Sequence, residues 1–122
     1  MKDMRKKTGS LGEAAAAAFL MEKGVRILQK NYRCRYGEID LIGLDGSVYL
    51  VVEVKTRSSS AQGEPAEAVD FRKQRKICLT FDFYRMKEKL DDYTPVRFDI
   101  IEIDRYGRCR WIKNAFEYHE PV

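Results

Sequence analysis

The sequence predicts an α/β fold in which a mixed central β-sheet is flanked by α-helices. Three observations lead to this class: an alanine-rich helical stretch near the start, three strand-like segments after it, and a second helical stretch followed by two further strands. At 122 residues with 44% hydrophobic content, the chain can bury one core. We therefore expect a single domain over residues 1–122, with residues 1–9 as a mobile basic N-terminus.

The first half of the chain predicts one helix and three strands. The helix is expected from about Ser10 to Lys23, and Gly24 would close it as a left-handed C-cap. Three alternating or apolar segments follow: Val25 to Arg33, Glu38 to Leu44 and Val48 to Thr56. Short connections between them predict an antiparallel meander.

The second half begins with a polar connection and a helix. Arg57 to Glu64 has the composition of a flexible loop, and Pro65 suits the first turn of a helical segment. Asp70 is expected to cap a longer helix that runs to about Lys89. Its apolar residues recur at helical spacing and should cover the apolar face of the sheet: Ile77, Phe81 and Tyr84.

Two strands close the chain. Val96 to Ile103 is expected to lie parallel to the third strand, because a helical crossover joins the two. Tyr106 and Gly107 form a turn into a last strand from Arg108 to Ile112. On the fourth strand, Arg97 and Asp99 are more readily explained as a structural pair than as catalytic groups.

The hairpin between the second and third strands is the most informative segment. Asp45 and Gly46, flanked by apolar residues, predict a two-residue turn in which Leu44 faces Ser47. Side chains alternate between the faces of a strand, so the acids of both strands share one face with Lys55. A one-residue change of register would separate them.

With that turn, Glu38 faces Glu53, and Asp40 is a diagonal neighbour of Glu53 at roughly 7 Å. The other face carries only apolar residues and must belong to the core: Ile39, Leu41, Leu50, Val52 and Val54. Acids clustered beside such a core are costly unless they bind a cation. A hard divalent cation suits them, since Mg²⁺ takes one or two carboxylates together with phosphate oxygens. The alternative is an ordinary ion pair of Lys55 with Asp40 or Glu53.

The order of Asp40, a turn and then Glu53-Val54-Lys55 resembles the PD-(D/E)xK signature of restriction endonucleases, RecB-type nucleases and archaeal Holliday junction resolvases. The chain is more closely similar to a bacterial family of small, uncharacterised predicted endonucleases related to those resolvases. Ile39 stands where some relatives have Pro. The residues that carry the similarity span nearly the whole chain: Gly12-Glu13, Gly24, Ile27-Leu28, Asn31, Arg33, Gly37 to Ile42, Glu53 to Arg57, Ala68-Val69, Lys73 and Arg97 to Asp99.

The resemblance implies a restriction-endonuclease-like fold and a role for each matching residue. Asp40 and Glu53 would bind Mg²⁺ or Mn²⁺, and the carbonyl of Val54 would be a further ligand. Lys55 would serve the attacking water.

Glu13 matches an acid that junction resolvases bring to the active site from their first helix. Its alternative role is a capping box, in which Glu13 bonds back to the Ser10 amide. Glu38 shares the face of the acids and would contact a second metal, a basic neighbour or only solvent.

The charge balance permits binding to a polyanion. There are 23 Lys and Arg against 19 Asp and Glu, a net charge of +4. Basic clusters on a domain surface also serve solubility. The residues that we expect to contact nucleic acid are Arg33, Arg35, Arg57, Arg72, Lys73 and Lys76.

Two functions of different class are compatible with these residues. The first is a Mg²⁺-dependent endonuclease that cuts DNA, branched or damaged DNA included. The second is a non-catalytic module that keeps the nuclease fold and binds nucleic acid or recruits a partner. Action on RNA is a third option without a supporting motif. Symmetric cleavage of a junction would require a homodimer.

Other chemistries are not indicated. Cys34, Cys78 and Cys109 are odd in number and contain no C-x-x-C pair, so neither a disulfide framework nor a zinc site is expected. His119 is expected to be a plain surface residue. No apolar run approaches the roughly 20 residues of a membrane span, which favours a cytoplasmic protein without membrane contact.

Overall fold

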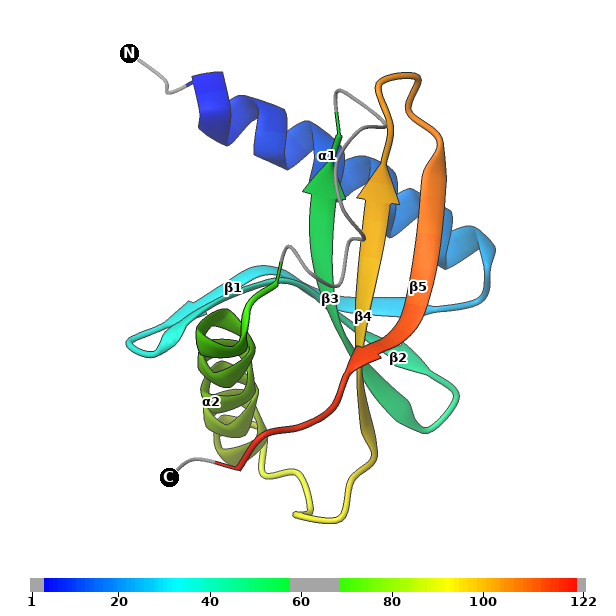
Figure 1. Cartoon of the computed structure of the whole chain (residues 1–122). Helices are drawn as coiled ribbons and strands as arrows, with labels where there is room; N and C mark the ends of the chain where they lie inside the picture. Colours follow the sequence, from blue (N-terminus) through cyan, green and yellow to red (C-terminus); the bar gives the residue numbers. More distant parts are fainter. Residues whose placement is uncertain (1–3, 58–68, 121–122) are drawn as a thin grey trace.

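A computed structural model describes residues 4–57 and 69–120 of the chain (Figure 1). One mixed five-stranded sheet has the order β1-β2-β3-β4-β5 and is packed between two helices. This arrangement confirms the α/β class with a mixed sheet flanked by helices. The predicted loop between Arg57 and Glu64 falls almost wholly outside the described residues, as does Pro65.

Helix α1 runs from Met4–Glu22 and therefore starts earlier than expected. Residues 4–9, part of the predicted mobile N-terminus, form the first turns of this helix, and residues 1–3 lie outside the described residues. Arginine and lysine are good helix formers, which allows the basic stretch to continue the alanine-rich helix backwards. Ser10 lies inside the helix, so the capping box with Glu13 is wrong. Gly24 has a φ of 91°, as the predicted left-handed cap requires.

The strands are β1 Arg26–Cys34, β2 Gly37–Asp45, β3 Val48–Thr56, β4 Val96–Ile103 and β5 Cys109–Phe116. The first three form the predicted antiparallel meander, and β4 is parallel to β3. Strand β5 pairs antiparallel with β4 and is longer than expected, because it continues past a register shift opposite Phe98 and Ile100.

The hairpin between β2 and β3 has a different register from the predicted one. Asp45 pairs with Val48 and Leu44 pairs with Tyr49, so the turn residues are Gly46 and Ser47. Gly46 has a φ of 62° and occupies the first central position, which a type II′ turn reserves for glycine. The slip is two residues, so the paired residues of the hairpin keep their predicted faces, whereas Ile39, beyond the last pair, does not.

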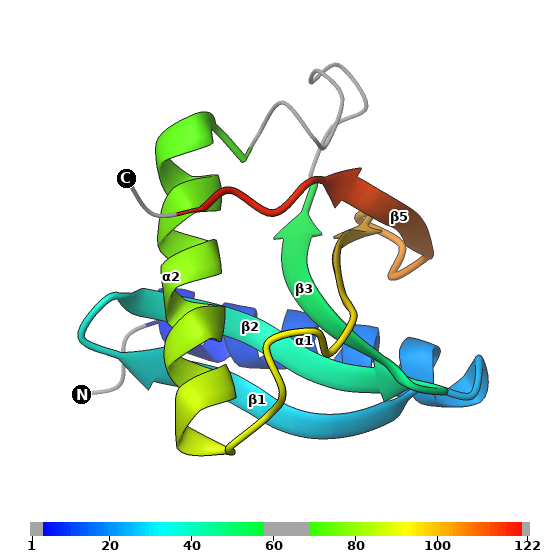
Figure 2. The ribbon, with the colours of Figure 1, turned by 90° about the horizontal axis from the view of Figure 1, so that it is seen from below.

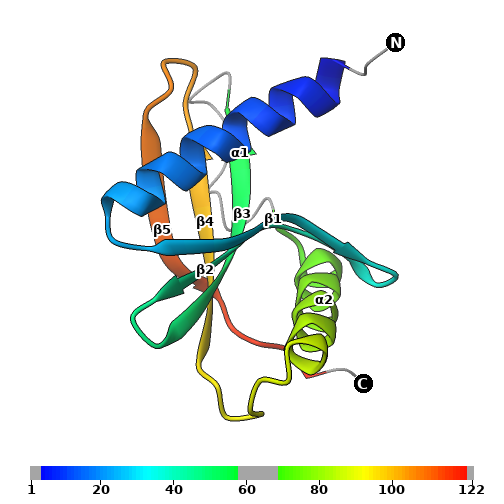
Figure 3. The same ribbon diagram turned by 180° about the vertical axis from the view of Figure 1, so that it is seen from behind.

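The helices cover opposite faces of the sheet (Figures 2 and 3). Helix α1 packs through Ala16, Ala17 and Leu20 on the face that carries the buried residues Leu41, Leu50, Val52, Ile101 and Ile103. Helix α2, Phe71–Lys87, packs on the other face, against Ile39, Ile42, Val51, Phe98 and Ile100.

The sequence predicted that the second helix covers the face of Leu41, Leu50 and Val52. This is wrong, because α1 covers that face, and Ile39 lies on the α2 side. The reason is that β3 is apolar on both faces, since Val51 faces α2 while Val52 faces α1. A pattern of this kind does not say which helix covers which face.

Helix α2 otherwise agrees with its prediction. Asp70 is the N-cap and accepts a hydrogen bond from the Lys73 amide at 2.8 Å. The stripe of Ile77, Phe81 and Tyr84 is buried.

The predicted pair of Arg97 and Asp99 is confirmed as structural. Asp99 is fully buried and accepts hydrogen bonds from Arg97 Nε at 2.9 Å, Trp111 Nε1 at 2.8 Å and the Asn114 amide at 2.8 Å. These bonds tie β4 to β5 beside the register shift.

Cys34, Cys78 and Cys109 are all free, so the chain forms no disulfide among its three cysteines. His119 is not a plain surface residue. It is half-buried against α2, where Nε2 lies 2.7 Å from Gln74 Oε1 and the ring contacts Phe71 edge-on. No helix in the described ranges is long and apolar enough to cross a membrane.

Candidate active site

The predicted acids Asp40 and Glu53 meet where β2 and β3 run side by side. The ladder between the two strands ends with the pair of Leu41 and Val52, and Asp40 and Glu53 follow directly beyond it. Asp40 Oδ2 accepts a hydrogen bond from the Val54 amide at 2.8 Å, which holds this carboxylate toward β3.

Glu53 is the most buried acid of the site, with 4% of its surface exposed. Its Oε1 lies 3.2 Å from the Lys73 ammonium on α2. Its Oε2 is buried and has no hydrogen-bond partner within residues 4–57 and 69–120. A carboxylate oxygen left in this state is costly, since burial removes the water that would otherwise solvate the charge. A bound cation or a proton at this oxygen would remove that cost.

Two lysines stand at the acids. Lys55, from β3, is the lysine that the sequence predicted. Lys73 reaches the site from the first turn of α2, pairs with Glu53 and lies beside the Lys55 side chain. Lys73, which the sequence predicts as a nucleic-acid contact, lies beside the acids and also lines the neighbouring cleft.

Glu13 extends the cluster from α1. It is half-buried and accepts a hydrogen bond from the side-chain amide of Asn31. Asn31 lies on β1 between the paired residues Lys30 and Tyr32, opposite Asp40. Helix α1 comes close to β3 here because Gly12 has no side chain: a Cβ at this position would lie 3.2 Å from Thr56 Cγ2.

The environment shifts the pKa of each of these acids upward. Burial, and next the charge of Asp40, raise the pKa of Glu53 to about 7 against the opposing pull of Lys73. Burial also raises the pKa of Asp40, although the Val54 amide opposes this shift. The pKa of Glu13 is raised by burial and by the nearby charge of Asp40. Burial and mutual repulsion therefore disfavour the charged form of each of these carboxyl groups.

The lysines shift in opposite directions. The pKa of Lys55 is lowered by burial and by its contact with Lys73. Burial also opposes the charge on Lys73, but the attraction of Glu53 and its contacts with Lys55 and Glu53 outweigh it and raise the pKa of Lys73. Lys55 is therefore the lysine that releases or accepts a proton more readily.

The remaining residues predicted to contact nucleic acid divide into two groups. Arg72 and Lys76 are exposed and line a cleft of about 370 Å³ between the start of β2 and α2, next to Lys73. Arg33 and Arg35 are exposed at the tip of the β1–β2 hairpin. Arg33 Nε pairs with Glu38 at 2.9 Å, and Arg35 Nη2 donates to the Tyr36 hydroxyl at 2.8 Å.

Glu38 is therefore an exposed partner of a basic neighbour, one of the roles considered for it. Arg57 lies apart from the other arginines. It forms a largely buried ion pair with Glu102 on β4.

The site has the donors for a hard cation. Asp40 and Glu53 offer carboxylate oxygens, one of them unpartnered. No three acidic, histidine or cysteine side chains within residues 4–57 and 69–120 converge as a closed metal cage. An open site of two carboxylates suits Mg²⁺ or Mn²⁺, because Mg²⁺ retains several waters and takes its other ligands from substrate phosphates. The Val54 carbonyl stays a predicted ligand, while its amide binds Asp40.

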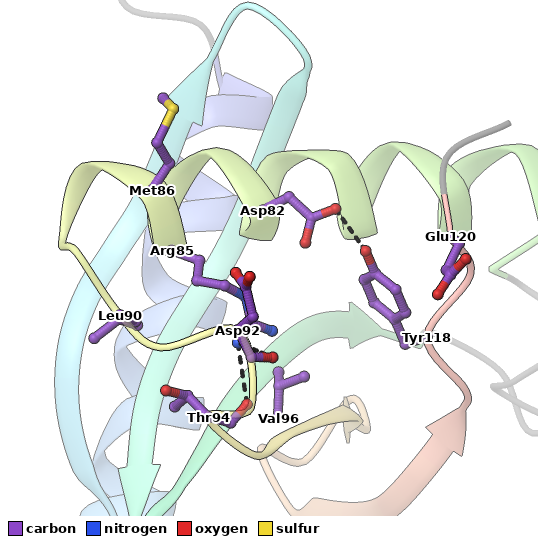
Figure 4. Close-up of a pocket in the computed structure, with 9 residues that line it drawn as sticks. All are labelled: Asp82, Arg85, Met86, Leu90, Asp92, Thr94, Val96, Tyr118 and Glu120. Carbon is purple, nitrogen blue, oxygen red and sulfur yellow. Dashed lines mark hydrogen bonds between the residues drawn. The ribbon is translucent and has the colours of Figure 1, made fainter.

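A second cleft, of about 630 Å³, lies between the C-terminal half of α2 and the chain's last described residues (Figure 4). Tyr118 donates a hydrogen bond to Asp82 Oδ2 at 2.7 Å, and Arg85 Nη1 donates to the carbonyls of Asp91 and Thr94 at 3.0 and 3.1 Å. These contacts hold the loop after α2. None of the predicted site residues lines this cleft.

Sequence reasoning missed two participants, Lys73 as a partner of Glu53 and Asn31 as a partner of Glu13. Asn31 carried a usable signal, since asparagine is a poor strand former and here has a φ of 54°, a conformation in which asparagine is enriched. For Lys73 the only signal in the sequence is its position in a run of basic residues. Nothing in that run separates it from Arg72 or Lys76.

Comparison with known proteins gives one family. The family model described as "Uncharacterised protein family UPF0102" matches residues 12–103. A UPF0102 protein from Caldanaerobacter subterraneus subsp. tengcongensis is 51% identical over 84% of each chain. One from Clostridium tetani is 43% identical over 96% of this chain and 99% of its own. One from Legionella pneumophila is 37% identical over 93% and 98%, respectively.

Proposed function

Since the chain belongs to the family of uncharacterised proteins UPF0102, its function has to be inferred from its own site, and we propose that it is a metal-dependent nuclease that hydrolyses phosphodiester bonds in DNA. The similarity of Asp40, Glu53 and Lys55 to the PD-(D/E)xK signature supports this proposal. So does their meeting on neighbouring strands at one end of α2.

One observation carries the proposal: Glu53 is buried beside Asp40, and its Oε2 has no partner among the residues that the structure describes. An ordinary surface ion pair would leave both carboxylate oxygens in water, and a purely structural buried acid would have both satisfied, as Asp99 does. A buried oxygen that points at no protein donor is typical of a site completed by a cation.

Asp40 and Glu53 would hold the divalent cation. When bound, Mg²⁺ or Mn²⁺ supplies positive charge that stabilises the negative charge developing on the reacting phosphate. Asp40 is positioned for this by the Val54 amide, and Glu53 by its place in the centre of the sheet.

The lysine at the acids has a separate part. Lys55 is half-buried, and its lowered pKa makes it able to take a proton from the attacking water or to return one to the leaving oxygen. Glu13, held by Asn31, adds a further carboxylate on the α1 side of the cluster. In this assignment the acids bind the metal, and Lys55 transfers the proton.

The substrate would enter along the basic cleft beside α2. Arg72 and Lys76 are exposed on its wall, and Arg33 pairs with Glu38, another residue of that wall. Such charges bind a phosphate backbone without reading base sequence. DNA as the target follows from the nuclease resemblance, and an RNA strand of the same sequence is the comparison that tests it.

The test is a cleavage assay with Mg²⁺ or Mn²⁺ on linear, flapped and four-way DNA, and on the matching RNA. Wild type and Glu22→Gln, which alters an exposed acid at the end of α1 outside the cleft, should cut at the same rate. Asp40→Asn and Glu53→Gln should lose cleavage while they keep the circular dichroism spectrum of wild type. Cleavage retained in either folded variant would refute the proposal. DNA binding without cleavage, unaffected by Mg²⁺ and by Lys55→Met, would instead identify a non-catalytic module.

A further inference from the structure

Lys73 forms an ion pair with Glu53, the acid that would also bind a divalent cation. Its ammonium is 3.2 Å from Glu53 Oε1, and Asp40 also attracts it. No other ammonium or guanidinium group in the described ranges forms an ion pair with Glu53. The buried acid thus already has one cation, supplied by the chain itself.

The backbone of Lys73 is fixed, whereas its side chain is free to leave. Its amide is capped by Asp70 at 2.8 Å, and α2 is anchored one turn later by the buried Ile77. The Lys73 side chain is 44% exposed, while that of Glu53 is 5% exposed. An ion pair with one partner in solvent can open without disturbing the core, because the lysine regains water as it moves out.

From this geometry we infer that Lys73 is an internal counter-cation, which holds Glu53 when no divalent cation is bound and has to leave when one binds. The inference rests on the proposed function. A divalent cation at Glu53 would be repelled by an ammonium group within hydrogen-bond distance of the same carboxylate. Metal binding and the Lys73 to Glu53 pair therefore exclude one another, and the pair weakens the affinity of the site for metal.

The ammonium group of Lys73, once released from Glu53, can remain in the cleft beside α2. Lys73 lines the cleft of about 370 Å³ together with Arg72 and Lys76. Once displaced from Glu53, it adds a third positive charge to the wall along which a phosphate backbone would run. Metal binding would thus change Lys73 from an internal partner of Glu53 into a substrate contact, and so couple loading of the site to binding of DNA.

Titration of the metal-free protein with Mn²⁺ by calorimetry, without DNA and at pH 8, tests the inference. Lys73→Met should bind Mn²⁺ roughly ten-fold more tightly than wild type, because the competing cation is gone. Lys76→Met removes the same charge from the same cleft but has no contact with Glu53, so its affinity should stay within about two-fold of wild type. Glu53→Gln should abolish binding.

The outcomes separate this inference from the proposed function. Equal or weaker Mn²⁺ binding by Lys73→Met, with binding still lost in Glu53→Gln, would overturn the counter-cation role and leave the metal site standing. Absence of binding in wild type and Lys73→Met alike would overturn both.

A second measurement covers the case in which Lys73→Met fails to fold. In wild-type protein with ¹³C-labelled lysine, Mg²⁺ should move the Lys73 ¹³Cε resonance toward that of an exposed lysine, and leave Lys76 unchanged. A Lys73 signal that stays in place while metal binds would refute displacement.

Discussion

Replacing Glu53 by Gln should make the metal-free protein more stable at alkaline pH and reduce the dependence of its stability on pH. Glu53 is buried with one unpartnered oxygen, so its carboxylate form is unfavourable in the folded state. Glutamine has nearly the same shape and carries no charge. The variant therefore mimics the protonated acid at every pH.

The direction follows from proton linkage. The pKa of Glu53 is raised from 4.5 to about 7 on folding, so between these values the native state binds more protons than the unfolded state. The stabilising contribution of protonated Glu53 is fully present below pH 4.5 and is lost as the pH rises through 7. The difference corresponds to about 3 kcal/mol, at about 1.36 kcal/mol per pKa unit. Asp40 shares these protons, so the figure belongs to the pair.

Urea denaturation in EDTA, at pH values from 4.5 to 8, measures the effect as a difference between the two proteins. The free energy of unfolding of Glu53→Gln minus that of wild type should rise by about 3 kcal/mol across this range. Glu38→Gln is the matched control, since Glu38 is exposed and pairs with Arg33. It should follow wild type within about 0.5 kcal/mol. Parallel curves for wild type and Glu53→Gln would refute the assignment of a strained, buried carboxylate.

Three further predictions follow from the described contacts. Asp99→Ala should lower the free energy of unfolding by about 3–5 kcal/mol, because it removes the buried acceptor that joins β4 to β5. Urea denaturation measures this difference, and a loss below about 1 kcal/mol would contradict that role. Asn31→Gly keeps the positive φ but removes the donor to Glu13, and should slow cleavage about 10–100-fold without unfolding the protein; an unchanged rate would show that Glu13 needs no orientation. Arg72→Ala should reduce the slope of log affinity for DNA against log salt by about 0.9, whereas Arg110→Ala, exposed on β5, should leave it unchanged; equal slopes in the two variants would exclude the cleft as the DNA path.

The predicted register of the hairpin was wrong, but the predicted faces of its paired side chains were right. The sequence indicated a two-residue turn at Asp45 and Gly46, and the turn is one residue later on each strand, at Gly46 and Ser47. A slip of two residues preserves the face of the paired side chains, because strands repeat every two residues. Ile39, beyond the last pair, changes face, and Asp40 reaches β3 through the hydrogen bond that it accepts from the Val54 amide.

For the helices, local sequence patterns predicted the buried residues but not the sheet face that each helix covers. The apolar stripe of Ile77, Phe81 and Tyr84 predicted a buried helix face, and this is confirmed. The choice of sheet face was wrong, because Val51 and Val52 make β3 apolar on both sides. Which helix takes which face depends on how the whole chain crosses the sheet.

The sequence by itself determined the elements, the α/β class and the shared face of Asp40, Glu53 and Lys55, because helix and strand periods and turn chemistry are local properties of a chain. Only the tertiary structure decided that Lys73 reaches Glu53 and that Asn31 holds Glu13. These contacts join α2 to β3 and β1 to α1, and no periodicity links residues on separate elements. The burial that leaves Glu53 Oε2 without a partner likewise arises only when the sheet and α2 pack together.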